Sequence, residues 1–340
     1  MFLVHPSEFP RRRKRCERVV KEFLALERET VAACNVCNST RAVIIARRDR
    51  YGFPVRTALC TNCGLVYLAD RFTSSGYGEF YGGGGYRRLS SLYNGTRISV
   101  EYVHEVHLAY STDLIDAVKG YVSGRDGGAL LDIGGGAGLV AQRVARYFDL
   151  RPTVLEPSAE DVKEAKRLGV EAFEGSLEGW ETAARFDLIL LCKTIEHLFD
   201  LRSALRKIRG LLKPNGLFYC DIVDFLEACR HEGPPEVTSK IDHCFWLCQE
   251  TAPSIFRASG LEVVSMNTVC GPNYVGFLLR RIDQTPPPQM DRPWIEAQLR
   301  RLREMEADWQ DSVAVPYDAA DWLKRRGYRA KRAVARLLGK

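Results

Sequence analysis

The stretch Ala129-Leu-Leu-Asp132-Ile-Gly134-Gly-Gly136-Ala-Gly138-Leu-Val140 decides the fold of this chain. A short apolar run ends in Asp132, glycines follow at alternate positions, and an amphipathic segment begins directly after them. Short apolar runs closed by turn residues are typical of buried parallel strands. Glycine lets the backbone turn sharply and approach a ligand closely, because no Cβ intervenes. We therefore predict a strand, a glycine turn and a helix N-terminus that form a nucleotide-type site at the carboxyl edge of an α/β sheet.

The second predicted strand, Thr153–Glu156, ends in an acid that suits the same site. A carboxylate about 20 residues after such a glycine turn is placed to bind two ribose hydroxyls. NAD enzymes use such an acid as well, and Gly136-Ala-Gly138-Leu-Val-Ala141 loosely fits the dinucleotide fingerprint, so an NAD enzyme is one alternative. That match alone is weak, and an ordinary tight turn between a strand and a helix is a further alternative.

Several motifs of the chain resemble those of class I S-adenosylmethionine (SAM) methyltransferases. Asp132-x-Gly-x-Gly-x-Gly138 resembles their first motif, and Phe186-Asp-Leu-Ile, Glu196-His197-Leu and Leu211-Leu-Lys-Pro-x-Gly216 resemble the second half of such domains. The resemblance covers about residues 100–282. It implies an α/β fold with a doubly wound, seven-stranded Rossmann-like sheet of order 3-2-1-4-5-7-6, in which the last strand is antiparallel.

The resemblance also implies SAM as cofactor and assigns residues to it. Asp132, Gly134, Gly136 and Gly138 would hold its amino-acid part, Glu156 its ribose, and Ser176 and Leu177 its adenine. Asp242-His243-Cys-Phe-Trp246, then residues 249–260 and 261–267, resemble the family's closing helix and sixth strand, and residues 273–281 would form the seventh.

Methyl transfer from a sulfonium is an in-line displacement, in which the protein supplies proximity and orientation. A hydroxyl or acidified C–H acceptor also needs a base near neutral pH, for which histidine is the usual choice. His197 follows the carboxyl end of the predicted fourth strand, and His243 and Asp221 are the other candidates. The alternative for each is a structural hydrogen bond.

Two Cys-x-x-Cys pairs, Cys34/Cys37 and Cys60/Cys63, predict a metal site among the eleven cysteines of the chain. Each pair forms a knuckle, and Asn38 and Gly64 tolerate the left-handed backbone that such turns use. Four thiolates suit tetrahedral, structural Zn²⁺, although the separation of the pairs is slightly longer than usual. A redox dithiol is the alternative.

These features divide the chain into five predicted segments, and the first, at residues 8–33, reads as one amphipathic helix. Residues 71–99, rich in glycine and tyrosine, predict either a flexible connector or a lid over the site. The segments are a helical arm (1–33), a zinc-ribbon-like module (34–70), the lid or linker (71–99), the methyltransferase domain (100–282), and a linker with a basic helical tail (283–340).

Composition is that of an ordinary globular protein, with 46% hydrophobic and 27% charged residues. The net charge of +6 is concentrated in Arg11–Arg15 and Lys324–Lys340, which suit nucleic acid, an anionic membrane surface, a partner subunit or plain solvation. No secretory h-region and no apolar run of about 20 residues is present, so we expect a cytoplasmic protein.

A cysteine-knuckle module ahead of such a domain resembles the sugar C-methyltransferases and related enzymes of polysaccharide and natural-product biosynthesis. Asp242-His243 replaces the Glu-His pair of that pattern, and the large additional C-terminal domain is missing. Methylation of an oxygen or a carbon of a sugar, nucleotide sugar, glycan or small metabolite is therefore the favoured function. The alternatives are a zinc-knuckle RNA methyltransferase, an NAD-dependent oxidoreductase and a non-catalytic SAM-binding protein.

Overall fold

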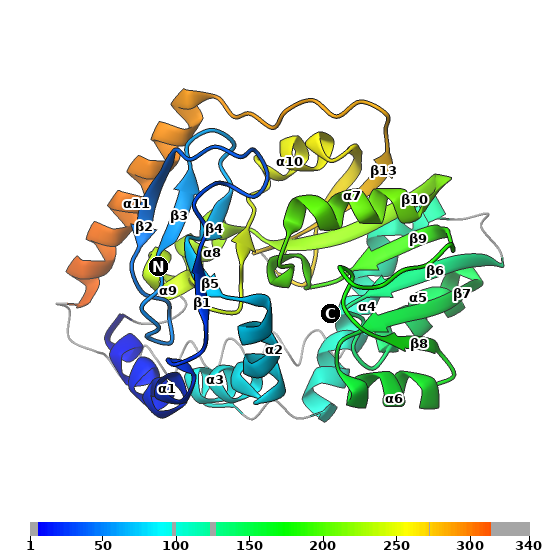
Figure 1. Cartoon of the computed structure of the whole chain (residues 1–340), viewed down its shortest axis with the longest axis horizontal. Helices are drawn as coiled ribbons and strands as arrows, with labels where there is room; N and C mark the ends of the chain where they lie inside the picture. The colour runs from blue at the N-terminus through cyan, green and yellow to red at the C-terminus, as the bar shows by residue number, and fades with distance from the viewer. Residues whose placement is uncertain (1–5, 97–99, 123–126, 272, 314–340) are drawn as a thin grey trace, which may run out of the picture.

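The computed structural model describes residues 6–96, 100–122, 127–271 and 273–313. Figure 1 shows a large twisted sheet on one side of the molecule and smaller sheets with their helices on the other. No helix in these described ranges is long and apolar enough to cross a membrane.

The large sheet has seven strands, and its order is that of the prediction, 3-2-1-4-5-7-6. β13 runs antiparallel to both of its neighbours, whereas the strands from β8 to β10 are parallel. From one edge to the other, the strands are β8 (Glu171–Glu174), β7 (Leu150–Glu156), β6 (Gly128–Ile133), β9 (Phe186–Leu191), β10 (Leu212–Val223), β13 (Tyr274–Arg281) and β12 (Leu261–Thr268). The predicted fold class is confirmed.

Both faces of this sheet are covered, which explains why its central strands read as unbroken apolar runs. In β9, Leu188 and Leu190 pack in one hydrophobic cluster, and Ile189 and Leu191 pack in the other. The first cluster includes α4 (Val100–Val122), α5 (Leu139–Phe148) and α6 (Ala159–Arg167). The second includes α7 (Leu201–Leu211), α10 (Ala252–Ala258) and most of the N-terminal core.

A second sheet joins the N-terminal part of the chain to a segment far away in sequence. Its order is β11-β4-β3-β2, with bounds Phe245–Trp246, Val66–Leu68, Thr57–Cys60 and Ala42–Ala46. The predicted closing helix over 249–260 is present in shortened form as α10 (Ala252–Ala258), and the motif that precedes it enters the small sheet as β11. Phe245 and Trp246 are about 1% exposed, so burying them in the N-terminal core outweighs any helical preference of the segment.

The prediction of a single helix over residues 8–33 is wrong beyond Phe23. After a 3₁₀ turn, η1 (Pro6–Glu8), the helix α1 covers only Phe9–Phe23. Arg28–Thr30 forms a strand, β1, which pairs with β5 (Asp70–Phe72) in a small antiparallel sheet. The basic run on α1 is used inside the protein. Arg13, for example, donates to the Asp49 carbonyl at 2.6 Å and pairs with Glu236 at 2.7 Å.

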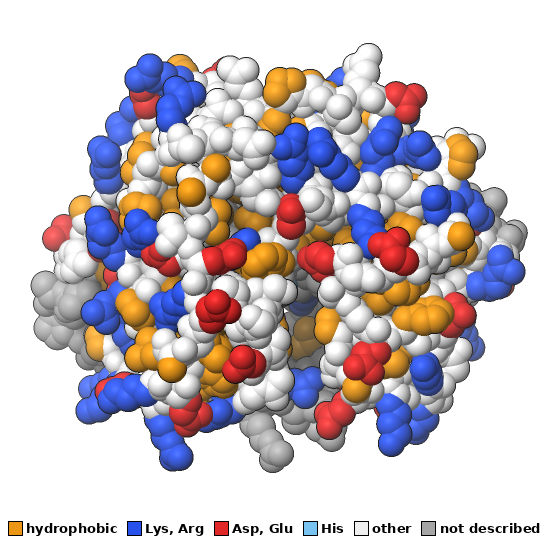
Figure 2. Space-filling model, in the orientation of Figure 1, with side chains coloured by type: hydrophobic (Ala, Val, Ile, Leu, Met, Phe, Trp, Pro, Cys, Tyr) orange, Lys and Arg blue, Asp and Glu red, His pale blue; other side chains and the backbone are white. Residues whose placement is uncertain are grey.

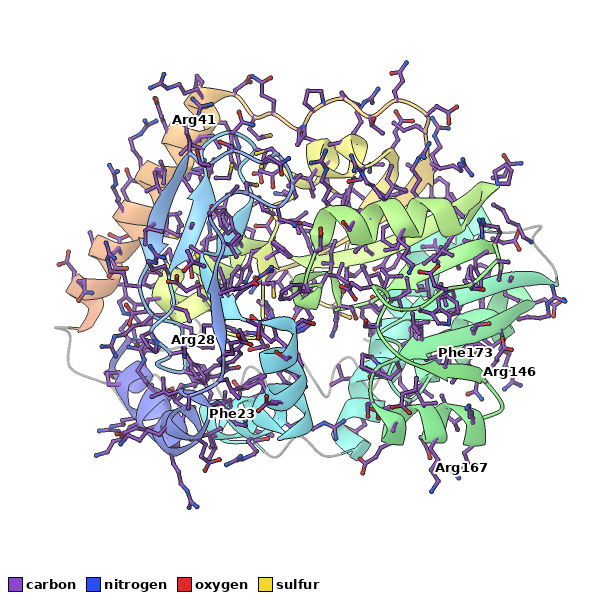
Figure 3. The ribbon with its side chains drawn as sticks, viewed as in Figure 1. Phe23, Arg28, Arg41, Arg146, Arg167 and Phe173 are labelled. Atoms are coloured by element: carbon purple, nitrogen blue, oxygen red, sulfur yellow. The ribbon has the colours of Figure 1, made fainter. Side chains whose placement is uncertain are left out.

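The glycine- and tyrosine-rich segment folds into α2 (Ser74–Gly82) and α3 (Gly85–Asn94) rather than an irregular connector. Thr73 caps α2 by accepting from Gly76 N, and Gly84 turns the chain into α3 with a φ of 68°. Both helices lie near α1, where the Phe23 ring meets Phe80 edge to face at 5.2 Å (Figure 3).

The remaining helices are α8 (Phe225–Glu232), α9 (Pro235–Thr238) and α11 (Arg292–Val313). α11 lies along the outside of the small sheet (Figure 1) and buries Ile295, Leu302 and Trp309. Trp309 meets the Phe9 ring edge to face at 6.0 Å. This part of the predicted tail therefore docks on the chain's own core, and the basic run Lys324–Lys340 lies outside the described residues.

Candidate active site and cysteine cluster

The glycine loop between β6 and α5 has the backbone that the sequence predicts. Gly134, Gly136 and Gly138 adopt φ values of 69°, 54° and 78°, a left-handed region that other residues enter only with strain. A Cβ on Gly134 would lie 2.7 Å from Thr194 Cγ2, whereas a Cβ on Gly136 would meet nothing within 4 Å. The loop is therefore packed against the end of β9 on one side and bare on the other.

Asp132 lies below this loop with its carboxylate almost fully buried, at 1% exposure. Neither of its oxygens has a hydrogen-bond partner among the described residues. Burial, together with the charges of Glu156 and Asp221, raises the pKa of Asp132 to about 8. A buried carboxylate without donors fits a cationic ligand, because such a ligand would supply the missing compensation.

Glu156 ends β7 beside the loop, as predicted. Its Oε2 accepts from Gly136 N at 3.0 Å and its Oε1 from Ser158 N at 2.9 Å, and burial raises its pKa. The turn with Ser176 and Leu177 follows β8, and its first amide, Gly175 N, donates to the Glu156 carbonyl at 3.1 Å. The strand ends thus bring the predicted ribose and adenine residues to the same edge of the sheet.

The end of β9 carries the next part of the site. The following 3₁₀ turn, η2 (Ile195–His197), carries Glu196 and His197 and is separate from α7. Lys193 has a φ of 51°, and its N–H donates to Asp221 Oδ1 at 2.6 Å. Asp221 is fully buried, and burial together with the charge of Glu196 raises its pKa to about 7.

His197 is partly exposed and held by a neighbouring loop and by α2. Its Nδ1 lies 2.7 Å from the Asp242 carbonyl oxygen and 3.1 Å from the Tyr81 hydroxyl. A carbonyl oxygen only accepts, so Nδ1 carries the proton and the lone pair of the neutral ring is on Nε2. His197 is therefore oriented as a base with a defined tautomer.

His243 faces His197, with ring centroids 4.8 Å apart and planes nearly perpendicular. It is buried, and burial and the nearby Lys240 hold its pKa well below the usual value, so the ring is neutral. His243 Nε2 lies 3.4 Å from Lys240 Nζ and 3.7 Å from Asp242 Oδ2. Both oxygens of Asp242 are buried without a hydrogen-bond partner among the described residues.

The ligand atoms of His197, Asp242 and His243 lie within 4.8 Å of one another, which is a spacing that a metal ion can bridge. Lys240 Nζ lies 3.4 Å from His243 Nε2 and would compete with a metal ion for that nitrogen, although burial lowers the pKa of Lys240. Together with the fixed tautomer of His197, this contact favours proton transfer over metal binding as the role of the cluster.

α2 and α3 complete one wall of the site. Tyr86, at the start of α3, has its ring 6.1 Å from that of His197, and Arg87 pairs with Asp161 on α6 at 3.5 Å. Figure 2 shows the surface hollowed between the part of the molecule that carries α2 and the part that carries β8 and α6. The glycine- and tyrosine-rich segment thus spans from the histidines to the helix beside Glu156.

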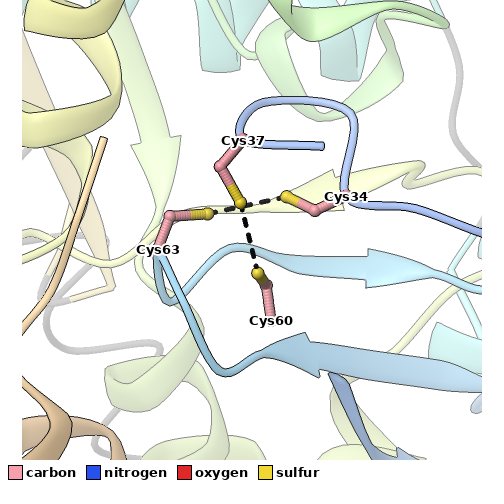
Figure 4. A group of neighbouring side chains, drawn as sticks. All are labelled: Cys34, Cys37, Cys60 and Cys63. Carbon is pink, nitrogen blue, oxygen red and sulfur yellow. Dashed lines mark hydrogen bonds between the residues drawn. The ribbon is translucent and has the colours of Figure 1, made fainter. Parts of the chain in front are cut away.

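The four predicted metal ligands converge at the ends of their two knuckles (Figure 4). Sγ of Cys34 and Cys63 are 3.5 Å apart, those of Cys37 and Cys60 are 3.6 Å apart, and all four lie within 4.8 Å of one another. Four ligands at a Zn–S distance of about 2.3 Å lie roughly 3.8 Å apart in a tetrahedron, so the cluster fits Zn²⁺.

The backbone of the knuckles supports this assignment. Asn38 and Gly64 take φ values of 58° and 75°, as the sequence predicts. Asn38 N donates to the Cys34 carbonyl and Gly64 N to the Cys60 carbonyl, so the two turns have the same hydrogen-bond pattern. A closed set of four thiolates offers no open coordination position, which is typical of a structural site.

Comparison with known proteins bears on slightly less than half of the chain. Residues 102–266 match the family model described as "Methyltransferase domain". This segment is similar to known methyltransferase domains. The match includes the glycine loop, Glu156, Asp221 and both histidines, and it leaves the cysteine cluster and α11 outside.

The curated relatives agree with this assignment over part of their length. "Ubiquinone biosynthesis O-methyltransferase" of Methylocella silvestris is 28% identical over 142 residues, which is 37% of this chain and 55% of that protein. The protein of the same name from Bradyrhizobium diazoefficiens is 31% identical over 94 residues, or 26% of this chain and 37% of that protein. The chain therefore spans about half or less of these relatives.

Solved methyltransferase structures are similar to the domain at low identity. Human N-acetylserotonin methyltransferase in complex with SAM is 17% identical, with a TM-score of 0.46 over 61% of this chain and 59% of that one. A SAM-dependent methyltransferase from Clostridium acetobutylicum is 13% identical, with a TM-score of 0.42 over 52% and 92% of the two chains. The fold assignment rests on the strand order given above.

Sequence reasoning missed Lys240 and gave no role to the side chain of Asp242, which it named only in the Asp242-His243 pair. Tyr81 lies in the segment that was predicted to be a connector or a lid, and Lys240 and Asp242 lie in a loop. Buried ionisable residues in a loop are a signal only once burial is known, and burial here comes from the small sheet. In that loop the sequence marked the pair Asp242-His243 and proposed a catalytic role for His243 alone.

Proposed function

We propose that this protein is a SAM-dependent methyltransferase that transfers a methyl group to an oxygen or carbon of a small acceptor, with His197 and His243 as its acid–base residues. The observation that carries the proposal is the position of His197. It follows the strand whose end, at Thr194, packs against the bare glycine loop, so the base and the cofactor loop lie on adjacent elements.

In this proposal, one group of residues binds the cofactor and another moves the proton. When bound, SAM supplies an electrophilic methyl group, and Asp132, the glycine loop and Glu156 would hold it at the strand ends. Ser176 and Leu177 would line its adenine side. None of these groups needs to move a proton, so their task is binding and orientation.

Proton removal from the acceptor belongs to the histidine pair. The Asp242 carbonyl and the Tyr81 hydroxyl hold His197 Nδ1 at 2.7 and 3.1 Å, which leaves Nε2 free to accept a proton. The Asp242 carboxylate and the neutral His243 lie beside it and can stabilise the imidazolium that forms. Asp221 is bonded to Lys193 N and is better placed to shape the strand end than to act as the base.

The acceptor class follows from the chemistry of this cluster. A histidine base suits a hydroxyl or an acidified C–H, as in a sugar, a nucleotide sugar, a glycan or a phenolic metabolite. The names of the curated relatives, which are O-methyltransferases, favour an oxygen acceptor. A sugar or nucleotide sugar remains our proposal because of the cysteine module that precedes the domain.

We further propose that Cys34, Cys37, Cys60 and Cys63 hold a structural zinc ion. The near-tetrahedral spacing of the four sulfurs supports it, and the cluster lies at the end of β3, within the sheet that also contains β11. The ion would stabilise the module and take no part in methyl transfer.

The test is a methyl-transfer assay of the purified protein with labelled SAM against nucleotide sugars, glycans, phenols and RNA, together with calorimetric titration of SAM and NAD. Label in a hydroxyl-bearing small molecule, lost in His197→Gln while SAM still binds, is the expected result. Label in RNA alone would refute the acceptor class, and binding of NAD without SAM would refute the activity.

A further inference from the structure

The loop that carries Asp242 and His243 is held by the cysteine module, not by the methyltransferase sheet alone. β11 directly follows this loop and pairs with β4, so the loop enters the small sheet as soon as it leaves the site. Leu68 N of the module also donates to the Cys244 carbonyl at 3.1 Å.

The centre of this attachment is Asp49, in the long turn between β2 and β3. Asp49 is fully buried, and its Oδ1 accepts from three backbone amides of its own turn, those of Tyr51, Gly52 and Phe53, at 2.8–3.0 Å. Its Oδ2 is used differently, because it accepts from Ile241 N at 2.9 Å. One oxygen therefore shapes the turn and the other reaches the loop, one residue before Asp242.

Further contacts from the module surround the same loop backbone. Arg50 N donates to the Ser239 carbonyl at 2.9 Å, and the Arg50 guanidinium, which also pairs with Glu232, donates to the Thr238 carbonyl at 3.2 Å. From α2, outside the module, the Tyr77 hydroxyl donates to the Ile241 carbonyl at 2.8 Å. Both the N–H and the C=O of Ile241 are therefore hydrogen-bonded, the first by the module and the second by α2.

A buried carboxylate is a costly way to shape a turn, since an amide or a hydroxyl would avoid the desolvation of a charge. Burial raises the pKa of Asp49 to about 7 in spite of its four amide donors. A carboxylate at this position is explained if its two oxygens bind two different segments, the turn of Asp49 itself and the loop at Ile241. An asparagine could not replace it in both, because it offers only one acceptor oxygen.

We propose that Asp49 is a positioning residue for the methyl transfer proposed above, and that through Ile241 N–H it sets the backbone from which Asp242 and His243 reach the histidine cluster. The cysteine module is then a part of the active-site framework. This inference rests on the proposed function for its kinetic consequence, but its structural consequence can be measured separately.

The direct test is Asp49→Asn. The asparagine oxygen can keep the three amides of the turn, but its NH₂ group then faces Ile241 N–H, so the change acts on the loop. Tyr77→Phe is the second variant; it removes the hydrogen bond to the Ile241 carbonyl and leaves a buried ring. The matched control is Asp224→Asn, because Asp224 is about equally buried and accepts from Glu227 N and Gln249 N rather than from the loop that carries Asp242 and His243.

Three readouts separate positioning from folding: kcat, the Kd for SAM, and the ¹⁵N imidazole signals of the histidines in the purified full-length protein. We expect Asp49→Asn and Tyr77→Phe to lower kcat by about tenfold and to shift the His243 and His197 signals, with Kd for SAM changed less than about twofold. Asp224→Asn should leave the imidazole signals in place.

Unchanged imidazole signals in both variants would overturn the inference, whatever the activity. If the wild-type protein methylates no acceptor, the proposed function fails, and the imidazole signals still decide whether the module positions the loop. If Asp49→Asn does not fold, Tyr77→Phe still tests the step on which the inference depends, that hydrogen bonds to the Ile241 backbone set the imidazoles, because loss of one hydroxyl leaves the core volume intact. Unchanged imidazole signals in Tyr77→Phe would then overturn the inference.

Discussion

The glycine loop offers a sharp prediction, since the structure contains a matched control for the backbone strain of its central glycine. Gly136 has a φ of 54°, and a Cβ there would meet nothing within 4 Å. Gly169, in the turn after α6, has a φ of 78° and equally open space around it. Alanine at either position introduces the same kind of strain without a clash in the protein.

The magnitudes follow from that geometry. A left-handed conformation costs an alanine roughly 1–2 kcal/mol relative to glycine, so Gly136→Ala and Gly169→Ala should lower the free energy of unfolding by similar amounts of that order. Only the new methyl on Gly136 enters the space proposed for the cofactor. Crowding a packed contact by one methyl costs about 1–3 kcal/mol, which corresponds to a Kd for SAM raised roughly 5- to 150-fold.

The assay combines urea unfolding of both variants with calorimetric titration of SAM at one temperature and pH. Gly134→Ala serves as a third point, because its Cβ would lie 2.7 Å from Thr194 and should destabilise the protein more than either of the others. Equal affinity of the Gly136 and Gly169 variants for SAM would refute the reasoning, since the loop would then not approach the cofactor.

Four further outcomes are expected. Cys60→Ser should lose most of the bound zinc in metal analysis and unfold at a lower temperature. His197→Gln should lower kcat by about 10²–10⁴ with Kd for SAM unchanged. Burial raises the pKa of Asp132 to about 8, and a cationic ligand favours the ionised form of this carboxylate. The affinity for SAM should therefore rise by up to about tenfold per pH unit as the pH increases toward 8 and level off above it. In Asp132→Asn the affinity should not change with pH in this range. Trp309→Ala should lower the free energy of unfolding by about 3–5 kcal/mol.

Controls for these outcomes lie in the same structure. Cys229→Ser changes a buried thiol outside the cluster and should keep the metal. Metal content unchanged in Cys60→Ser, kcat unchanged in His197→Gln, or an affinity for SAM that falls with rising pH would each contradict the corresponding assignment. A stability change below about 1 kcal/mol in Trp309→Ala would mean that α11 does not dock on the core in solution.

Local sequence determined those parts of the protein whose physics is local. The run before Asp132, the alternate glycines and the acid at Glu156 follow one another within a single strand–turn–helix–strand unit, and their φ values and positions came out as predicted. The cysteine knuckles are local in the same way, because each needs only one tight turn with a residue that tolerates positive φ.

The sequence failed where burial by a distant segment decided the conformation. No strand was predicted at residues 242–246, yet Phe245 and Trp246 pair with β4, more than 170 residues earlier in the chain. Arg28–Thr30 looked like the end of a helix until β5 offered it a partner. Intrinsic helix preferences amount to less than about 1 kcal/mol per residue, whereas burying a large side chain is worth about 1.5–3 kcal/mol.

By itself, then, the sequence determined the glycine turn after β6 and the two cysteine knuckles, because each follows from a short-range pattern of apolar, glycine or cysteine residues. The sheet order was implied by the resemblance to a known family, and the strand pairing agrees with it. Only the tertiary structure decided how the acceptor side is built. Tyr81, Asp242, His243 and His197 come from three separate segments, and no spacing in the chain encodes that they meet. Their meeting depends on a shared hydrophobic core between the small sheet and the large one, which is a property of the whole fold.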